Sequence, residues 1–281
     1  MEIFKQIAPL KAFLRDLKCQ GQSVGLVPTM GALHNGHISL FRASKAENQV
    51  TVGSIFVNPI QFNNHNDLIK YPTTIEKDTA LLETVGCDVL FSPENEEMYP
   101  QKTTITMDFG HLDKIMEGKF RPGHFSGVAL VVSKLFNIVH PDQAYFGQKD
   151  WQQFAVIQRL TDELNFDIKL HSVATLREED GLALSSRNLR LDPEQRKKAN
   201  IFYKGLFEAK TALARGSSLA RVKETVRGMI EAHPDVRLEY FELADSKNLN
   251  LLENVEDSRQ PIMCIAGYIG EIRLIDNMFL D

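Results

Sequence analysis

The chain has 281 residues, of which 43% are hydrophobic and 25% are charged, and its formal net charge is -5. This balance is typical of a globular protein with one large or two modest domains, and it excludes an overall field that would attract nucleic acid or an anionic membrane. Three scattered cysteines without a CxxC pair, no apolar run of bilayer length and no signal-peptide pattern predict a cytoplasmic protein without a disulfide framework.

Expected strands and helices alternate along the N-terminal part of the chain. The segment 50–58 is β-branched and almost wholly apolar, which is typical of a parallel sheet covered on both faces. The expected strands are 23–29, 50–58, 87–92, 143–146 and 167–175, and the expected helices are 38–47, 75–85, 125–139 and 150–164. This alternation predicts an α/β fold, a Rossmann-like, doubly wound parallel sheet with right-handed crossovers.

The pattern changes near residue 188. Two helices are expected at 193–215 and 219–233, and they are followed by strands at 236–244, 261–268 and 271–279. Helices followed by consecutive strands indicate a small α+β unit. We therefore predict a Rossmann-like catalytic domain at 1–187 and a smaller α+β C-terminal domain at 188–281.

A glycine-containing turn joins the first expected strand to the first expected helix. It has the sequence PTMGALHNGH over Pro28–His37. At such a turn, backbone N–H groups point outward and the helix dipole favours an anion. Gly31 and Gly36 allow the backbone to approach a ligand closely, and His34 and His37 can each donate a hydrogen bond to a phosphoryl oxygen. Residues 30–37, which we call the cradle, are thus interpreted as a phosphate-binding site.

Two other interpretations of the cradle histidines have to be weighed. A histidine beside an apolar helix is usually structural, and an HxxH pair can bind a metal ion. The order of strand, glycine turn, His-x-Gly-His and helix is similar to the HxGH signature of the nucleotidylyltransferase superfamily. No third ligand lies nearby at metal spacing, so phosphate contact is favoured over zinc.

Two further segments carry groups that bind phosphate. Leu184–Arg187, which we call the phosphate loop, offers two hydroxyls and a guanidinium, although alone it is better explained as a polar turn between domains. Gly147–Asp150 follows an expected strand and brings the charge of Lys149, with a capped surface turn as the alternative. With the cradle, these segments are expected at the crevice where open α/β sheets bind ligands.

At these residues the chain resembles the pantothenate synthetase (pantoate–β-alanine ligase) family, and the resemblance extends over its whole length. The joint order and spacing of several runs carry it. These runs are Pro28–His37, Phe56–Phe62, Arg121–Phe125, Tyr145–Gln153, Asp180–Asn188 and Arg273–Asn277.

The resemblance implies an ATP-dependent condensation of (R)-pantoate with β-alanine to pantothenate, AMP and pyrophosphate, through a pantoyl adenylate. It implies His37 as general acid, with His34, Lys149 and Arg187 as further catalytic groups. Gln61 and Gln153 are the implied pantoate ligands, and Gln61 also borders the β-alanine site. The implied ATP-binding residues are Met30, Gly31, Ala32, Leu33, His34, Asn35, Gly36, His37, Gly147, Gln148, Lys149, Asp150, Leu176, Leu184, Ser185, Ser186 and Arg187.

The resemblance also implies a homodimer, Mg²⁺ as cofactor and a C-terminal domain that acts as a lid. The chain departs from the family near the expected metal, because Lys77, Asp78 and Leu81 stand where some relatives carry an Asp pair and a Gln. Only Asp78 of these could contact a cation, and we assign no metal-binding residue. We expect neither a nucleic-acid nor a membrane partner.

Two alternatives remain open at the level of sequence. A nucleotidylyltransferase of the same superfamily would share the cradle but not Gln61 and Gln153 in their present contexts. A non-catalytic nucleotide-binding or RNA-binding module is disfavoured by the balanced charge and by the presence of both phosphate signatures.

Overall fold

The computed structural model describes residues 1–280, and its contacts divide the chain into two compact units. The N-terminal unit comprises Met1–Gln148 and Val156–Ala174, and the C-terminal unit comprises Lys149–Ala155 and the chain from Thr175 on. The C-terminal unit therefore begins before the expected border at 187–188 and includes a short piece around Lys149. As domain borders, 1–187 and 188–281 stay a prediction, because compactness does not show that a segment folds alone.

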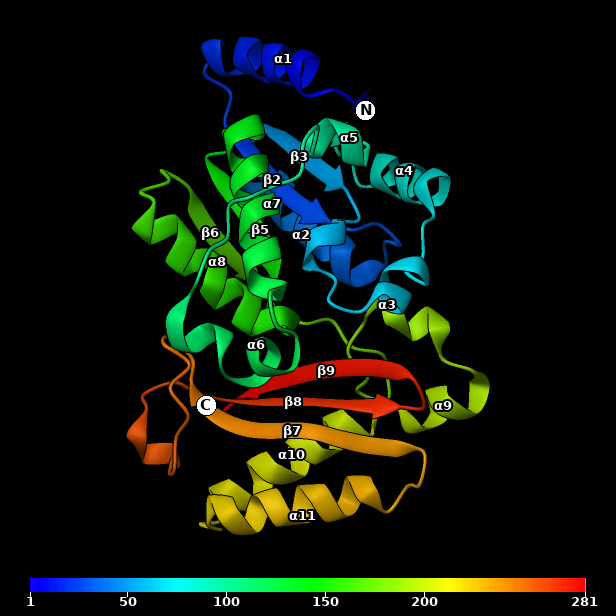
Figure 1. Cartoon of the computed structure of the whole chain (residues 1–281), viewed down its shortest axis with the longest axis vertical. Helices are drawn as coiled ribbons and strands as arrows, with labels where there is room; N and C mark the ends of the chain where they lie inside the picture. The colour runs from blue at the N-terminus through cyan, green and yellow to red at the C-terminus, as the bar shows by residue number, and fades with distance from the viewer. Residues whose placement is uncertain (281) are drawn as a thin grey trace. The chain divides into compact units, whose positions relative to one another are not determined.

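A six-stranded parallel sheet in the order β1-β4-β3-β2-β5-β6 forms the centre of the N-terminal unit (Figure 1). All of its strand pairs are parallel, which confirms the predicted doubly wound α/β fold. The strands are β1 (Glu2–Phe4), β2 (Val24–Thr29), β3 (Val50–Ile55), β4 (Val89–Phe91), β5 (Gln143–Gly147) and β6 (Lys169–Val173).

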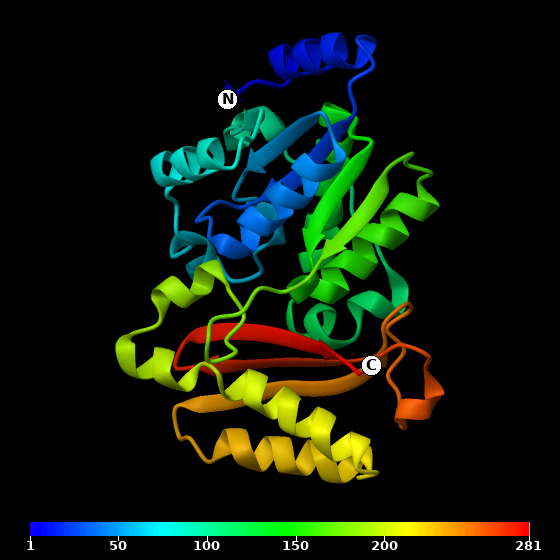
Figure 2. The same ribbon diagram turned by 180° about the vertical axis from the view of Figure 1, so that it is seen from behind.

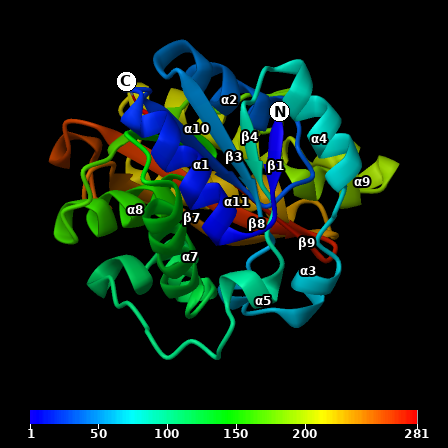
Figure 3. The same cartoon turned by 90° about the horizontal axis from the view of Figure 1, so that it is seen from above.

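Helices cover both faces of this sheet. Figure 1 shows α7 in front of the sheet, Figure 2 shows α2 on the opposite face, and Figure 3 shows the strands between these two helices. The helices of this part are α1 (Ile7–Cys19), α2 (Asn35–Glu47), α3 (His65–Ile69), α4 (Ile75–Thr84), α5 (Asn95–Met98), α6 (Met116–Phe120), α7 (His124–Val139) and α8 (Trp151–Glu163), with 3-10 turns η1 (Pro59–Gln61), η2 (Gly110–Asp113) and η3 (Gln148–Asp150).

The core beneath α2 explains why the sheet holds this helix. Phe41 of α2 and Tyr145 of β5 are completely buried there, together with Val27, Leu82 and Leu90. Burying each large apolar side chain contributes about 1.5–3 kcal/mol. The same packing fixes the first turn of α2, where the cradle ends.

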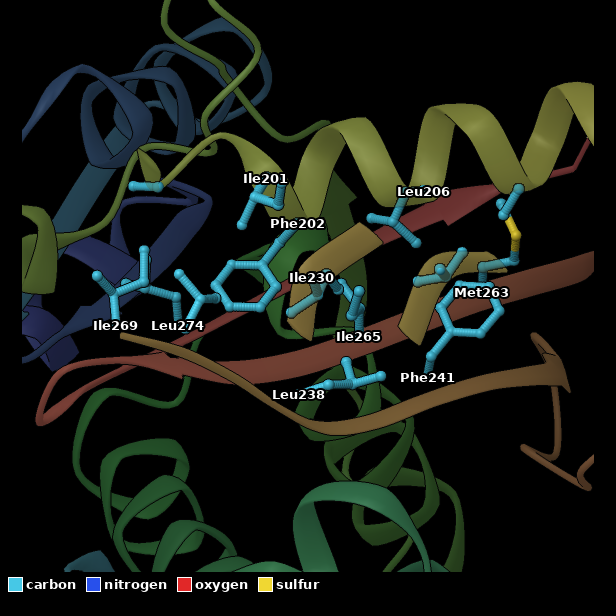
Figure 4. Packing of buried hydrophobic residues seen from close by; sticks show 14 of the residues in the cluster. Ile201, Phe202, Leu206, Ile230, Leu238, Phe241, Met263, Ile265, Ile269 and Leu274 are labelled. Carbon is cyan, nitrogen blue, oxygen red and sulfur yellow. The ribbon is translucent and has the colours of Figure 1, made fainter. Parts of the chain in front are cut away.

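The C-terminal unit pairs a three-stranded antiparallel sheet, in the order β7-β8-β9, with helices on one of its faces (Figure 1). Figure 4 shows Phe202 and Leu206 of α10 pointing toward Ile265 of β8 and Leu274 of β9. This confirms the predicted small α+β unit. Its elements are η4 (Ser186–Arg190), α9 (Pro193–Lys198), α10 (Ile201–Ala214), α11 (Leu219–Glu231), β7 (Val236–Asp245), η5 (Val255–Asp257), β8 (Pro261–Ile269) and β9 (Ile272–Phe279).

Several boundaries differ from the sequence prediction for local reasons. The helix expected at 38–47 begins at Asn35, because His34 caps it. The strand expected at 50–58 ends at Ile55, before Asn58 caps the 3-10 turn that Pro59 begins. The helix expected at 193–215 is divided into α9 and α10, and the three-residue strand β1 was not predicted. Among the described residues, no helix has both the length and the apolar character to cross a bilayer.

Candidate active site

The cradle leaves β2 through a turn with two successive left-handed residues, Gly31 (φ 80°) and Ala32 (φ 49°). This conformation is ordinary for glycine but costs about 1–2 kcal/mol for a residue with a Cβ. Asp78 of α4 offsets that cost. Its Oδ2 accepts the N–H of Ala32 at 2.9 Å, and its Oδ1 accepts the N–H of Leu33 at 2.8 Å. The carboxylate is only 2% exposed, so it holds the turn through two charge-assisted hydrogen bonds.

Asp78 is therefore placed differently from the sequence interpretation, which left it as a group that could contact a cation. Besides the two backbone N–H groups, its Oδ1 accepts the Thr74 hydroxyl at 3.1 Å. Within residues 1–280, no three His, Cys, Asp or Glu side chains gather as a metal site. Both carboxylate oxygens of Asp78 thus already accept hydrogen bonds from within the protein.

The two cradle histidines form a reciprocal cap at the start of α2. His34 Nδ1 accepts the N–H of Gly36 at 3.1 Å, and His37 Nδ1 accepts the N–H of His34 at 3.3 Å. Their ring centroids are 4.0 Å apart. A backbone N–H can only donate, so each Nδ1 is unprotonated and each neutral ring carries its proton on Nε2. The cap therefore selects the tautomer in which the two rings donate through Nε2.

Gln61 lies next to the cradle within the N-terminal unit. Its side chain is 6% exposed, and its Nε2 lies 3.3 Å from Sδ of Met30, the first cradle residue. Its Oε1 accepts Asn58 Nδ2 at 3.1 Å, while Asn58 Oδ1 accepts the hydroxyl of Tyr99 at 2.9 Å. Burial raises the pKa of Tyr99, which keeps the phenol a donor. This chain fixes which edge of the Gln61 amide donates.

The backbone at Gln61 is also held from α7. His124 Nδ1 lies 2.9 Å from Gln61 O, and His124 Nε2 lies 3.1 Å from Arg121 Nη1. A Cβ at Gly127 would lie 2.7 Å from both N and Cα of Gln61, so only glycine permits this approach. Sequence analysis singled out the run Arg121–Phe125 without giving it a role, and it missed Tyr99 entirely, for which no local pattern provides a signal.

The phosphate loop lies at the base of a short hairpin, residues 176–184, in the C-terminal unit. Leu184 N–H donates to Leu176 O at 3.0 Å, and Arg177 and Ala183 form a β-bridge between the two arms. Ser185 Oγ then accepts the N–H of Arg187 at 3.3 Å and caps η4. The loop is thus a structured turn between two hydrogen-bonded elements.

Lys149 belongs to the same unit as the phosphate loop. Its side chain is 15% exposed, and its Nζ lies 3.9 Å from Asp150 Oδ1. Lys149 and Ser185 line one small cavity together with Asn188 and Asp276. The structure therefore places Lys149 and Ser185 of the phosphate loop at the same cavity.

The predicted site residues divide between the two compact units. Met30 to His37, Gln61, Gly147 and Gln148 belong to the N-terminal unit, with the cradle following β2, Gln61 following β3 and Gly147 ending β5. Lys149, Asp150, Gln153, Leu176 and Leu184 to Arg187 belong to the C-terminal unit, where Leu176 is 42% exposed. Their binding roles stay predictions.

A parallel sheet that places a glycine turn and a histidine-capped helix after its central strand β2 defines a class, the α/β proteins that bind nucleotide phosphates. The sequence profile described as pantoate-beta-alanine ligase matches residues 2–279. The chain belongs to the pantoate–β-alanine ligase family, and it is a ligase.

Named relatives agree with this assignment over nearly the full chain. The pantothenate synthetase of Bacteroides thetaiotaomicron is 48% identical over 278 residues, which cover 99% of this chain and 98% of the relative. That of Porphyromonas gingivalis is 46% identical over 278 residues, with 99% of each chain covered.

Two solved structures also match over nearly the full chain. The pantothenate synthetase of Thermus thermophilus matches with a TM-score of 0.92 and 41% identity, and 99% of each chain is covered. The pantoate-beta-alanine ligase of Francisella tularensis, complexed with beta-gamma ATP and β-alanine, matches with a TM-score of 0.84 and 37% identity. That match covers 100% of this chain and 98% of the other.

Proposed function

We propose that this chain joins (R)-pantoate to β-alanine at the expense of ATP, and that it forms pantothenate, AMP and pyrophosphate through a pantoyl adenylate. The family match over residues 2–279 is the observation that carries the proposal. The alternative, a nucleotidylyltransferase of the same superfamily, shares the cradle but gives no reason for a buried, oriented Gln61 amide beside it.

In the first step, a pantoate carboxylate oxygen attacks the α-phosphorus of ATP, and the bond from that phosphorus to the bridging oxygen breaks as pyrophosphate leaves. Negative charge builds on the phosphate oxygens during this step. The backbone N–H groups of the cradle and the Nε2–H groups of His34 and His37 would stabilise it. Lys149, Ser185, Ser186 and Arg187 are proposed to donate further hydrogen bonds to these oxygens.

In the second step, the neutral β-alanine amine attacks the acyl carbon of the mixed anhydride, the bond from that carbon to the phosphate oxygen breaks as AMP leaves, and the proton released from the nitrogen passes to water. Gln61 would orient the pantoyl group because Asn58 fixes its Oε1 and leaves the Nε2 edge of the amide as the donating one. Gln153 would supply a second carboxamide. Holding amine and acyl carbon together replaces the need for an activated nucleophile.

The cap geometry adds a constraint to the general-acid role implied for His37. An imidazolium carries a proton on Nδ1, which would displace the N–H of His34 that this atom accepts. A neutral His37 that donates through Nε2 keeps the cap intact. We therefore propose hydrogen-bond donation to the leaving pyrophosphate as its main contribution.

Mg²⁺ and a homodimer are further parts of the proposal that rest on the family alone, and a cytoplasmic location also rests on the scattered cysteines of the sequence. Because both oxygens of Asp78 are used to hold the cradle turn, we propose that any Mg²⁺ is carried mainly by the ATP phosphates and water. No step above depends on it. Light scattering of the purified chain across a concentration series would test the dimer.

Mass spectrometry of the products from ATP, pantoate and β-alanine tests the main proposal. We expect pantothenate and AMP in equal amounts, with neither formed when pantoate is omitted. A nucleotidylyltransferase would instead transfer the adenylyl group to an acceptor phosphate and leave β-alanine unused. A nucleotide-binding module would consume no ATP.

A further inference from the structure

The run Arg273–Asn277 at the end of the chain has no role in the function proposed above. It lies in β9, an edge strand of the antiparallel sheet. Successive side chains of a strand point to opposite faces, yet Asp276 and Asn277 are both buried, at 6% and 5% exposure. Two adjacent buried polar side chains are costly unless each has partners, so the partners show what the pair does.

Asp276 binds the base of the hairpin that carries the phosphate loop. Its Oδ2 and Oδ1 accept Arg177 Nη1 at 2.6 Å and Nη2 at 2.9 Å in a bidentate ion pair. The same guanidinium donates to Gly181 O and Asn277 O, both at 3.1 Å, and lies 4.7 Å from the ring centroid of Tyr203. Both Nη atoms of Arg177 thus each donate two hydrogen bonds within the protein, and they hold both the base and the turn of the hairpin.

Asn277 binds the other cationic segment. Its Nδ2 donates to the backbone oxygen of Lys149 at 2.8 Å. The next anchor along that segment is Trp151, whose Nε1 donates to Ser246 O at 2.9 Å and whose ring meets Phe279 of β9 edge-on at 5.0 Å. The backbone that carries the Lys149 side chain is therefore tied to the end of β9.

We propose that Asp276 and Asn277, which we call the strand-end pair, are positioning residues for phosphate binding. Through Arg177 and through the Lys149 carbonyl, they set the distance between Lys149 and the phosphate loop. The inference rests on the proposed function, in which both segments contact one triphosphate. Two cations stabilise one transition state only when both are in place, and a small misplacement of either costs rate.

The same sheet supplies a matched control. Arg273 of β9 pairs with Glu239 of β7, with Nε 2.9 Å from Oε2, and the Glu239 side chain is 7% exposed. This second buried ion pair joins two strands of the sheet to each other, whereas Asp276 joins a strand to the hairpin. Glu239→Gln and Asp276→Asn therefore each remove a buried carboxylate from a partly buried arginine, and only the second should affect phosphate binding.

The test compares Asp276→Asn, Asn277→Ala and Glu239→Gln with the wild-type chain, at a temperature where circular dichroism shows all four folded. We expect Asp276→Asn and Asn277→Ala to slow pantoate-dependent exchange of labelled pyrophosphate into ATP by about tenfold or more. Conversion of preformed pantoyl adenylate should change much less, because no pyrophosphate is held in that step. Glu239→Gln should lose stability but keep its exchange rate.

Two results would overturn the inference. One is wild-type exchange in Asn277→Ala, and the other is an equal loss of exchange in Asp276→Asn and Glu239→Gln, which would make the pair merely structural. The wild-type chain tests the proposed function by itself. If it shows no pantoate-dependent exchange, the proposed function is wrong; if it is active, the two results above bear only on the strand-end pair. Calorimetric titration with ATP alone makes the same comparison without turnover, and equal affinity in all four chains would also count against the pair.

Discussion

The cradle and the phosphate loop are both held by a buried carboxylate, but the two carboxylates act on different parts of the chain. Asp78 accepts backbone N–H groups 45 and 46 residues away, so it fixes the cradle itself. Asp276 binds the Arg177 side chain 99 residues away. The cradle backbone is thus held directly by a carboxylate, whereas the phosphate loop is held only indirectly, through the hairpin that carries it.

The largest effect is expected at His37. His37→Ala removes a donor aimed at charge that develops only while pyrophosphate leaves, so the exchange reaction should slow by about 10²–10³-fold. Conversion of preformed pantoyl adenylate should stay near the wild-type rate. His37→Asn, which keeps an acceptor for the His34 N–H, is the control for the cap. Equal slowing of both half-reactions would show that His37 holds the cradle and not the leaving group.

The second effect concerns the carboxylate that holds the cradle. Asp78→Asn turns an amide donor toward one of two backbone N–H groups, so transition-state stabilisation should fall by about 2–3 kcal/mol, measured as kcat/KM for ATP. Excess Mg²⁺ should not restore it, because the lost bonds are made to the turn. Thr74→Val, which removes only the hydroxyl that Asp78 accepts, should have a smaller effect. If excess Mg²⁺ restored the full activity of Asp78→Asn, Asp78 would instead be a metal ligand.

The third effect concerns the hairpin that carries the phosphate loop. Gly181 has a φ of 92°, and a Cβ there would overlap the ring of Tyr203. Gly181→Ala should therefore lower the free energy of unfolding by about 2 kcal/mol, measured by urea denaturation. Gly216→Ala is the matched control, because its φ is 81° and a Cβ there would have no atom within 4 Å. If both variants lose the same stability, the packing against Tyr203 does not restrain the hairpin.

The smallest effect is expected at the exposed end of the hairpin. Arg196 Nη1 lies 2.7 Å from Asp180 Oδ2, and this hydrogen bond lowers the pKa of Asp180. The folded form then binds the proton less readily, so the pair stabilises the protein above the usual carboxylate pKa, and this contribution is lost as pH falls through the lowered value. Because both side chains are about one-third exposed, Asp180→Asn should cost only about 0–1 kcal/mol. A cost that persists in acid would contradict the assignment.

The sequence predicted the parallel sheet and the cradle because both depend on local patterns. Apolar strands and helical spacing mark the elements, and two glycines beside His34 and His37 mark an anion site within a single turn. The cap that selects the Nε2–H tautomer was not predictable, since it depends on the rotamers of both rings. Asp78 was noticed for its charge, but its role depends on α4 lying against the turn.

The residues that hold the site residues in place could not be predicted from the sequence. Tyr99 acts on Gln61 through Asn58, 41 residues earlier in the chain, and Arg177 meets Asp276 across 99 residues. Neither pair has a periodic or motif signal, because only the tertiary fold brings the partners together. Sequence analysis therefore identified the groups proposed to touch the substrates more readily than the groups that hold them in place.

Because Gly127 has no side chain, it limits how readily the proposed specificity for pantoate can be changed. A Cβ at Gly127 would lie 2.7 Å from the Gln61 backbone, so the segment around Gln61 packs directly against the backbone of α7. If Gln61 binds pantoate as proposed, its backbone cannot move toward α7 to make room for a bulkier or differently branched hydroxy acid. We expect laboratory evolution to proceed through side-chain exchanges at Gln61, Asn58 and Tyr99, while every library member altered at Gly127 is lost.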